Sequence, residues 1–429
     1  MVGIIMFGVA LLLLLLGFPV AFTFGGVALI FGVWAEGWDL FAFMPFRIYN
    51  IMQNVVLMAV PLFIFMGLVL QKTQLAEQLL ESMGRLFGTV RGGLAVSTIL
   101  VGALLAASTG VVGASVVAMG VISLPVMLKY GYNKGLACGT ICSAGTLGQI
   151  IPPSIILIIL GDVLGLPVGD LFQAAVVPGL VLVGIYVFYV LSIAWARPAA
   201  APPIPFEDDG STKTQHYLTA LKAILPPLAL IIVVLGSIFA GIATPTESSA
   251  LGSAGAILLA VLYRKFSWRL VFDSALETVK ITAMVFAILL GATAFSMTFT
   301  YTGGDTIVEE FMLQLPGEKW GFLILSMLII LLLGFFIDFV EISFIVVPIL
   351  SPIAESLGIN MLWFAILIAM NLQTSFLTPP FGFSLFYLKG VAPPSVRTVD
   401  IYRGVVPFIL IQVGVVISIL VYPELYGLG

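Results

Sequence analysis

Two stretches of the sequence, SAGTLGQIIPPS at residues 143–154 and MNLQTSFLTPPF at residues 370–381, decide how the chain folds. Each contains a proline pair, and each lies deep inside a long apolar segment. A proline removes a backbone donor and clashes with the preceding helical turn, so a pair that follows small polar residues predicts a membrane helix broken in two. Broken backbone at membrane depth is stable only where protein or a water-filled cavity covers it, and paired broken helices are typical of a transporter's binding site.

The composition is that of a polytopic helical membrane protein. Of 429 residues, 61% are hydrophobic and 9% are charged, and the mean hydropathy is +1.20. The net charge of −4 is spread over loops without a basic run, which argues against a nucleic-acid partner. We expect no enzyme, because His216 is the only histidine and lies in a polar loop. Cys138 and Cys142 are expected to be buried core thiols rather than metal ligands or a redox pair.

Several apolar runs have about the length needed to cross a bilayer. The first has no positively charged flank and no cleavage site, so we expect a retained span rather than a signal peptide. Two further runs, 93–128 and 320–357, are interrupted at their centres by Ser108-Thr109-Gly110 and by Asp338 to Glu341, so each is either two crossings or one re-entrant hairpin. The uninterrupted runs lie near 3–16, 18–34, 51–70, 135–160, 173–195, 223–240, 248–262, 281–300, 360–388 and 405–422.

The distribution of Lys and Arg favours two hairpins. If the N-terminus is outside and both interrupted runs return to the side they entered, all but two of the 17 basic residues, Arg47 and Lys319, fall in cytoplasmic loops. Each half then has five crossings and one hairpin, and an odd number inverts the second half relative to the first. A shift of 227 residues supports the repeat, because it places Pro152-Pro153 on Pro379-Pro380 and the pair Gly131 and Asn133 on Gly358 and Asn360.

The sequence therefore predicts an all-α membrane protein of about ten transmembrane helices plus two re-entrant hairpins, built as an inverted-topology repeat with two broken helices. Residues 72–91 have apolar positions at helical spacing, which predicts an amphipathic interfacial helix, either an arm between a moving part and a fixed frame or a plain surface helix. We expect the first repeat at 1–196 (scaffold helices 1–70, arm 71–92, hairpin 93–128, broken helix 135–160, helix 173–195), a Pro-rich cytoplasmic linker at 197–222, and the second repeat at 223–429 (helices 223–300, hairpin 320–357, broken helix 360–388, helix 405–422).

The two hairpin tips and the two proline breaks form a symmetric set of four polar interruptions. Their hydroxyl and glycine residues allow oxygen atoms to converge on a hard cation such as Na⁺, while the N-terminal ends of half-helices face an anion. The competing interpretation is that these residues only pack helices together. The candidate Na⁺ and substrate residues are Ser108, Thr109, Gly110, Ser115, Ser143, Gly145, Thr146, Pro152, Ser154, Asp338, Glu341, Asn371, Thr374, Ser375, Thr378 and Pro379, with Na⁺ itself expected at Ser108, Thr109, Thr146, Asp338, Thr374 and Thr378.

Asp338 and Glu341 are the most informative single residues, because a carboxylate within a spanning segment is costly and usually marks an ion or proton pathway. Three positions apart, they share one helical face. We expect at least Asp338 to bind a cation or couple protons, and the other interpretation is that the pair lines an aqueous vestibule. No Lys or Arg within the spans is available to bind a carboxylate substrate, and the absence of a Walker A motif argues against an ATP motor.

Five motifs resemble a known family. GFPVAF at 17–22, GIATPTESSALG at 241–252, GQIIPPS at 148–154, LTPPFGFSLFYLKGVAPP at 377–394 and DIYRGVVPF at 400–408 are together similar to the large membrane subunit of tripartite ATP-independent periplasmic (TRAP) transporters, the DctM-type permeases of the ion-transporter superfamily. The resemblance covers essentially the whole chain. One departure is Ser248-Ser249, where the family pattern has alanines.

This resemblance implies an elevator-type secondary transporter in the bacterial or archaeal cytoplasmic membrane, with a periplasmic N-terminus. It implies uptake of a small organic acid driven by a Na⁺ gradient, with Na⁺ as coupling ion and no other cofactor. A periplasmic substrate-binding protein and a small four-helix membrane subunit are the implied partners. The motif TPPFGFSLFYLKGVAPP resembles the branch of the family named for mannitol, chloroaromatic compounds or 2-oxo acids more than the sialate branch.

Three other functions are weighed against this one. A stand-alone Na⁺- or H⁺-coupled carboxylate carrier of the same superfamily would need no binding protein. A channel does not require paired hairpins and broken helices. An intramembrane enzyme would have only Asp338 and Glu341 as reactive groups, and it would turn over without an ion gradient.

Overall fold

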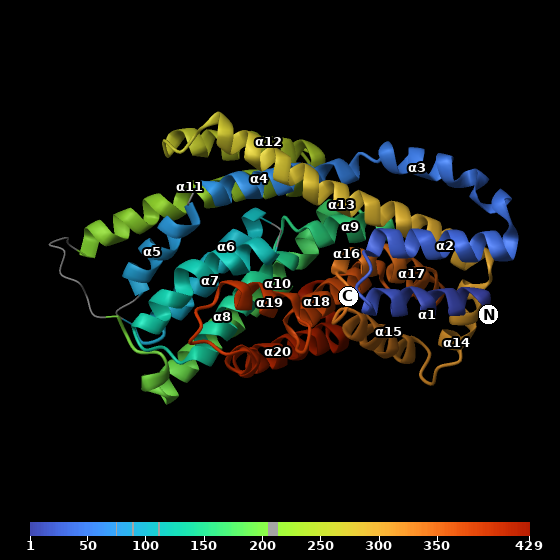
Figure 1. Cartoon of the computed structure of the whole chain (residues 1–429). Helices are drawn as coiled ribbons and strands as arrows, with labels where there is room; N and C mark the ends of the chain where they lie inside the picture. The colour runs from blue at the N-terminus through green and yellow to red at the C-terminus, as the bar shows by residue number, and fades with distance from the viewer. Residues whose placement is uncertain (74, 88–89, 110–111, 205–212) are drawn as a thin grey trace.

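The computed structural model describes residues 1–73, 75–87, 90–109, 112–204 and 213–429 as a two-layered helical bundle (Figure 1). The outer layer lies uppermost in Figure 1. This layer consists of α2 (Val20–Glu36), α3 (Met44–Met52), α4 (Ala59–Lys72), α11 (Lys213–Phe239), α12 (Pro245–Leu262) and α13 (Trp268–Tyr301). Two further helices, α1 (Val2–Leu15) and α14 (Gly304–Leu313), pack beside α13.

The inner layer holds both interrupted runs and both proline pairs. Its first-half members are α6 (Gly93–Thr109), α7 (Val112–Lys129), α8 (Lys134–Thr146), α9 (Ile155–Leu164) and α10 (Val168–Ala196). Its second-half members are α15 (Lys319–Leu333), α16 (Phe339–Glu341), a π-helical turn at Ile342–Val346, α17 (Val347–Ser356), α18 (Met361–Leu377), α19 (Phe383–Val391) and α20 (Thr398–Val421). The amphipathic helix α5 (Leu75–Phe87) packs against α6 and α11 and so joins the two layers.

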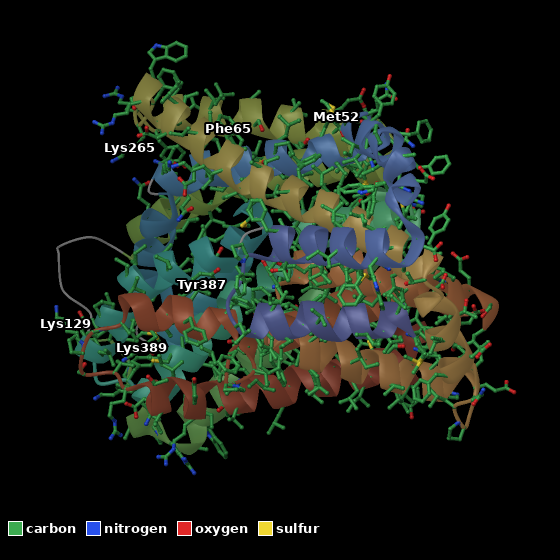
Figure 2. The ribbon with its side chains drawn as sticks, turned by 45° about the vertical axis from the view of Figure 1, so that its right-hand side comes forward. Met52, Phe65, Lys129, Lys265, Tyr387 and Lys389 are labelled. Carbon is green, nitrogen blue, oxygen red and sulfur yellow. The ribbon has the colours of Figure 1, made fainter. Side chains whose placement is uncertain are left out.

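The two halves carry the same order of elements. Moving the bounds of α7 by 227 residues gives 339–356, the span from α16 to the end of α17, and moving those of α9 gives 382–391, against Phe383–Val391 for α19. In Figure 1 the α6–α7 hairpin lies at the left of the inner layer and α15–α17 at its right, so the hairpins enter from opposite ends. Lys129, Lys265 and Lys389 all lie at the left end in Figure 2, consistent with the basic loops sharing one side of the membrane.

The repeated Gly and Asn residues have the same structural role in both halves. Gly131 and Gly358 follow α7 and α17 with φ of +79° and +64°, a left-handed conformation that ends a helix and favours glycine. Two residues later, the side chains of Asn133 and Asn360 accept hydrogen bonds from backbone amides in the first turns of α8 and α18, at 3.2 Å and 2.9 Å. The residues that end and cap these helices therefore repeat between the two halves, as the proline pairs do.

The structure refines some element boundaries. The region predicted as a linker, 197–222, includes the start of α11 at Lys213. The run at 51–70 is not one straight span: the segments Trp38–Met52 and Val56–Lys72 meet at a bend of 57°. The run at 281–300 is the second part of the 34-residue α13, whose first turn is capped by Ser267 at 3.1 Å.

Seven of the described helices are long and apolar enough to cross a membrane, or up to eight if the bent pair is one span. Several shorter apolar helices of 10–17 residues, among them α9, α15 and α18, fall below that length. Of these three, α9 and α18 are halves of the broken helices and α15 is the first arm of hairpin two. The expected total of about ten transmembrane helices stays a prediction.

The inner layer depends on a close crossing of α8 and α20. A Cβ atom placed on Gly139 would collide with the carbonyl oxygen of Gly404, and one placed on Gly404 would collide with that of Gly135. Small residues at such a crossing allow two helix backbones to touch, which is the main source of helix association inside a membrane. This contact joins the last helix of the second half to the broken helix of the first.

We expect Gly139→Ala to destabilise the protein by about 1–3 kcal/mol, because the added methyl group overpacks the crossing. The control is Gly414→Ala on α20, where an added Cβ meets no atom within 4 Å. Thermal unfolding of the detergent-solubilised protein measures both. Equal unfolding temperatures for the two variants would show that α8 and α20 do not touch in this way.

Candidate functional site

Both predicted breaks are confirmed. In the first, α8 ends at Thr146, a 3-10 turn covers Leu147–Gln149, and the helix resumes as α9 at Ile155. In the second, α18 ends at Leu377 and α19 begins at Phe383. The Pro152-Pro153 and Pro379-Pro380 bonds are both cis. Each break therefore interrupts the helical hydrogen-bond ladder between two short apolar half-helices.

Side chains from the chain itself bind several carbonyl groups that the breaks release. The hydroxyl of Ser154 donates to the carbonyl oxygen of Gln149 at 2.6 Å, and that of Ser384 to Phe376 at 2.9 Å. The phenol of Tyr402 donates to the carbonyl oxygen of Pro380 at 2.9 Å. These hydrogen bonds stabilise the breaks, because an unpaired polar group at membrane depth costs several kcal/mol.

The two halves exchange partners at the breaks. The second half-helix of the first break, α9, packs against α16, the π-helical turn and α17 of the other repeat. The second half-helix of the second break, α19, packs against α7 and α8 of the first repeat. Each hairpin therefore meets a half-helix from the opposite repeat. The first break is buried in the inner layer, whereas Pro380 and Phe381 of the second break are exposed.

Hairpin two also reaches the second break directly. Gly334, at the end of α15, lies so close to Ser375 that a Cβ would collide with the serine hydroxyl. The rings of Phe339 and Phe376 are 6.0 Å apart, and those of Phe336 and Phe381 are 5.4 Å apart. The structure thus places the start of the second hairpin arm, where Asp338 lies, beside the second proline pair.

Asp338 and Glu341 have different environments. Asp338 is half-buried and caps α16, with its Oδ1 accepting a hydrogen bond from the backbone amide of Phe339 at 2.6 Å. Glu341 is only 4% exposed, and among the described residues its Oε2 has no hydrogen-bond partner. A buried carboxylate oxygen without a partner is costly, and a bound cation is one way to satisfy it.

The candidate hydroxyl residues use their protons on their own helices. Ser143 donates to Gly139, Thr146 to Ser143, Thr374 to Met370, Ser375 to Leu372 and Thr378 to Thr374, at 2.7–2.9 Å. A hydroxyl that has donated its proton keeps lone pairs that can only accept, which is what a cation ligand requires. The arrangement therefore fits either helix packing or cation binding.

The remaining candidates divide into several groups. Asn371 donates to the carbonyl oxygen of Met327 at 2.6 Å and so ties α18 to α15. Gly145 lies where a Cβ would collide with Val116, so its contribution is close packing of α8 on α7. Ser115 is buried on α7. Pro152 and Pro379 shape the breaks, Gly110 lies outside the described residues, and so do the side chains of Ser108 and Thr109.

The structure adds Gln412 to the predicted residues. It also shows the surroundings of Gln149 and Gln373, which the sequence places among the polar residues of the breaks but which were not among the candidate ligands. Gln412 of α20 donates to the hydroxyl of Thr146 at 3.5 Å, and the fully buried amide groups of Gln149 and Gln373 have no partner among the described residues. Gln149 and Gln373 stand beside the breaks in the sequence, so their polarity was a usable signal. Gln412 gave no such signal, because its neighbour Thr146 is distant in sequence.

Comparison with known proteins decides the family. The family model described as "Tripartite ATP-independent periplasmic transporter, DctM component" matches residues 7–425. The chain belongs to this family. It is thus a multi-pass membrane protein and the large permease component of a TRAP transporter.

Individual relatives match nearly the whole of this chain. A C4-dicarboxylate TRAP transporter large permease from Rhodobacter capsulatus is 29% identical over 99% of this chain and 98% of its own. The permease of an isethionate TRAP transporter from Oleidesulfovibrio alaskensis, named DctMQ, is 29% identical over 96% of this chain and 64% of its own. The large permease of an ectoine/5-hydroxyectoine TRAP transporter from Ruegeria pomeroyi is 29% identical, covering 97% of this chain and 95% of its own.

A solved structure supports the fold. The YdaH transporter of Alcanivorax borkumensis aligns with a TM-score of 0.63 over 91% of this chain and 90% of its own, at 14% sequence identity. At that identity the likeness concerns the fold alone. It agrees with the helical arrangement of hairpins and broken helices described above.

We expect Asp338→Ala to cost about 1 kcal/mol of stability, because α16 loses its N-terminal cap, whereas Asp338→Asn should cost much less, since Asn caps as well as Asp. Thermal unfolding without added Na⁺ or substrate separates the two. An unfolding temperature lowered equally by both variants would mean that the negative charge, and not the cap, stabilises this turn.

Proposed function

We propose that this chain is the transporting subunit of a TRAP system that takes up a small organic anion together with Na⁺. The observation that carries the proposal is the packing of each half-helix against the opposite repeat, which gathers hydroxyl groups of both repeats and the acids Asp338 and Glu341 in one inner layer. Inverted repeats that meet at discontinuous helices are the usual construction of a secondary transporter's site.

The charges of the inner layer explain why a cation would be needed. Asp338 and Glu341 lie at the start of the second hairpin arm, whereas Lys389 of the second broken helix lies at one end of the bundle (Figure 2). Lys134 donates to the carbonyl oxygen of Ser395 at 2.7 Å, and Lys389 donates to that of Val396 at 2.8 Å. The acids thus have no basic partner among the described residues, and an anionic cargo would add further negative charge. Bound Na⁺ would offset both.

The cargo is proposed to be a small carboxylate or sulfonate. The named relatives include C4-dicarboxylate, isethionate and ectoine systems, whose cargoes share an oxyanion group on a small skeleton. Delivery by a periplasmic binding protein and buttressing by a small membrane subunit are proposed from family membership, as is a cytoplasmic-membrane location with a periplasmic N-terminus. The name DctMQ, on a relative longer than this chain, is compatible with a second membrane component.

Uptake into proteoliposomes tests this function. The complete system would contain this chain, its small membrane subunit and its binding protein, with labelled succinate, isethionate, ectoine or pyruvate outside. We expect uptake of at least one of these compounds that requires both the binding protein and an inward Na⁺ gradient. Uptake that is unchanged without the binding protein would point instead to a stand-alone carrier, and uptake without the gradient would remove Na⁺ coupling.

We also propose that transport occurs by movement of the inner layer against the outer layer. The two layers are linked by a hydrogen bond from the side-chain amide of Asn54 to Asp162 on α9. Asn54 is fixed in the outer layer, because its Oδ1 caps the next turn at Val56 and the adjacent Val55 carbonyl accepts a bond from Thr246 of α12. An elevator-like displacement of α9 would have to break this link.

A disulfide between Asn54→Cys and Asp162→Cys, in a background without Cys138 and Cys142, should therefore reduce uptake by at least about tenfold on oxidation and restore it on reduction. Val55→Cys with Thr246→Cys is the matched control, since both positions belong to the outer layer. Undiminished uptake by a fully cross-linked Asn54–Asp162 pair would rule out movement at this contact.

A further inference from the structure

Tyr387 of α19 lies over the first turn of α7, across the boundary between the repeats. A Cβ placed on Gly113 would lie 2.9 Å from Cζ of the tyrosine ring and 3.1 Å and 3.2 Å from the two Cε atoms. These three atoms are the hydroxyl end of the ring. The glycine therefore makes room for the phenol, and the hydroxyl is held beside the start of the second arm of hairpin one.

The helix that carries Tyr387 is firmly anchored. Leu388 is fully buried, and both Leu388 and Val391 pack so closely on Gly120 of α7 that an added Cβ would lie within 2.9 Å of them. Tyr387 itself is 40% exposed. One side of the ring thus rests on Gly113 while part of it remains open, further into the bundle than Lys129 and Lys389 (Figure 2).

The Tyr387 hydroxyl differs from the other hydroxyl groups near the breaks. Ser154, Thr374, Thr378, Ser384 and Tyr402 all donate to backbone carbonyls. The described part of the chain offers the Tyr387 hydroxyl no hydrogen-bond partner, so its proton is available to another acceptor. The phenol therefore lies against the second arm of hairpin one with its proton uncommitted.

We infer that Tyr387 contacts the transported molecule, with its hydroxyl donating a hydrogen bond to the oxyanion group of the cargo and its ring forming the wall of the site over Gly113. This inference rests on the proposed function and extends it to a residue that selects for an oxyanion. In a site whose lysines lie at the end of the bundle, a neutral donor of this kind can hold an anion without adding a permanent charge.

The test compares Tyr387→Phe with wild type in the complete proteoliposome system, using whichever of labelled succinate, isethionate, ectoine or pyruvate the wild type takes up. Loss of a hydrogen bond to a charged group should raise KM about tenfold. The Na⁺ concentration for half-maximal uptake at saturating cargo should stay unchanged, which a general loss of structure would not produce. Tyr422→Phe, at the exposed end of α20, is the matched control and should keep the wild-type KM.

A second variant tests the contact between the Tyr387 ring and Gly113. Gly113→Ala keeps the hydroxyl but pushes the ring away, so it should also raise KM, and thermal unfolding should confirm that both variants are folded. Wild-type KM for Tyr387→Phe would overturn the inference while leaving the proposed function intact. If the wild type takes up none of the four compounds, the proposed function fails, and the inference fails with it.

Discussion

A helix broken at membrane depth exposes backbone groups that lipid cannot satisfy, at a cost of several kcal/mol for each one left unpaired. This chain breaks two helices, and it binds the released carbonyls with hydroxyl groups from Ser154, Ser384 and Tyr402. The half-helices beyond the breaks, α9 and α19, are then covered by helices of the opposite repeat. Each half-helix therefore packs partly on the other repeat, which makes the inner layer a joint product of both halves.

The same requirement brings the polar and acidic groups of the inner layer together. Once carbonyls are freed and hydroxyl protons are committed to the helices, the remaining lone pairs and the acids Asp338 and Glu341 form an electron-rich interior. Lys134 and Lys389 are engaged with loop carbonyls at one end and do not offset it. An interior of this kind favours cations, and it accepts an anionic cargo only with cations or neutral donors such as Tyr387. Family membership and charge distribution thus lead to the same proposal of coupled uptake.

Much of the fold could be predicted because the decisive residues act locally. Proline pairs break helices wherever they occur, and Gly131, Asn133, Gly358 and Asn360 end and cap helices by their own backbone and side-chain chemistry. Hydropathy does not locate a kink or a polar first turn, so it did not indicate the bend between Met52 and Val56 or the start of α11 at Lys213. The contacts of Tyr387 with Gly113 and of Asn54 with Asp162 were beyond prediction, since they join residues more than 100 positions apart. The Na⁺ assignments of individual hydroxyl groups stay predictions.

The most direct test of the account is the influx of radiolabelled Na⁺ into proteoliposomes that contain the complete transport system, measured with and without cargo, for wild type and for Asp338→Asn. The account predicts cargo-dependent Na⁺ influx in the wild type and its loss in the variant, which keeps the helix cap but not the charge. Cargo uptake without accompanying Na⁺ influx, or an equal influx in the variant, would contradict the claim that the acids of the inner layer couple Na⁺ to transport.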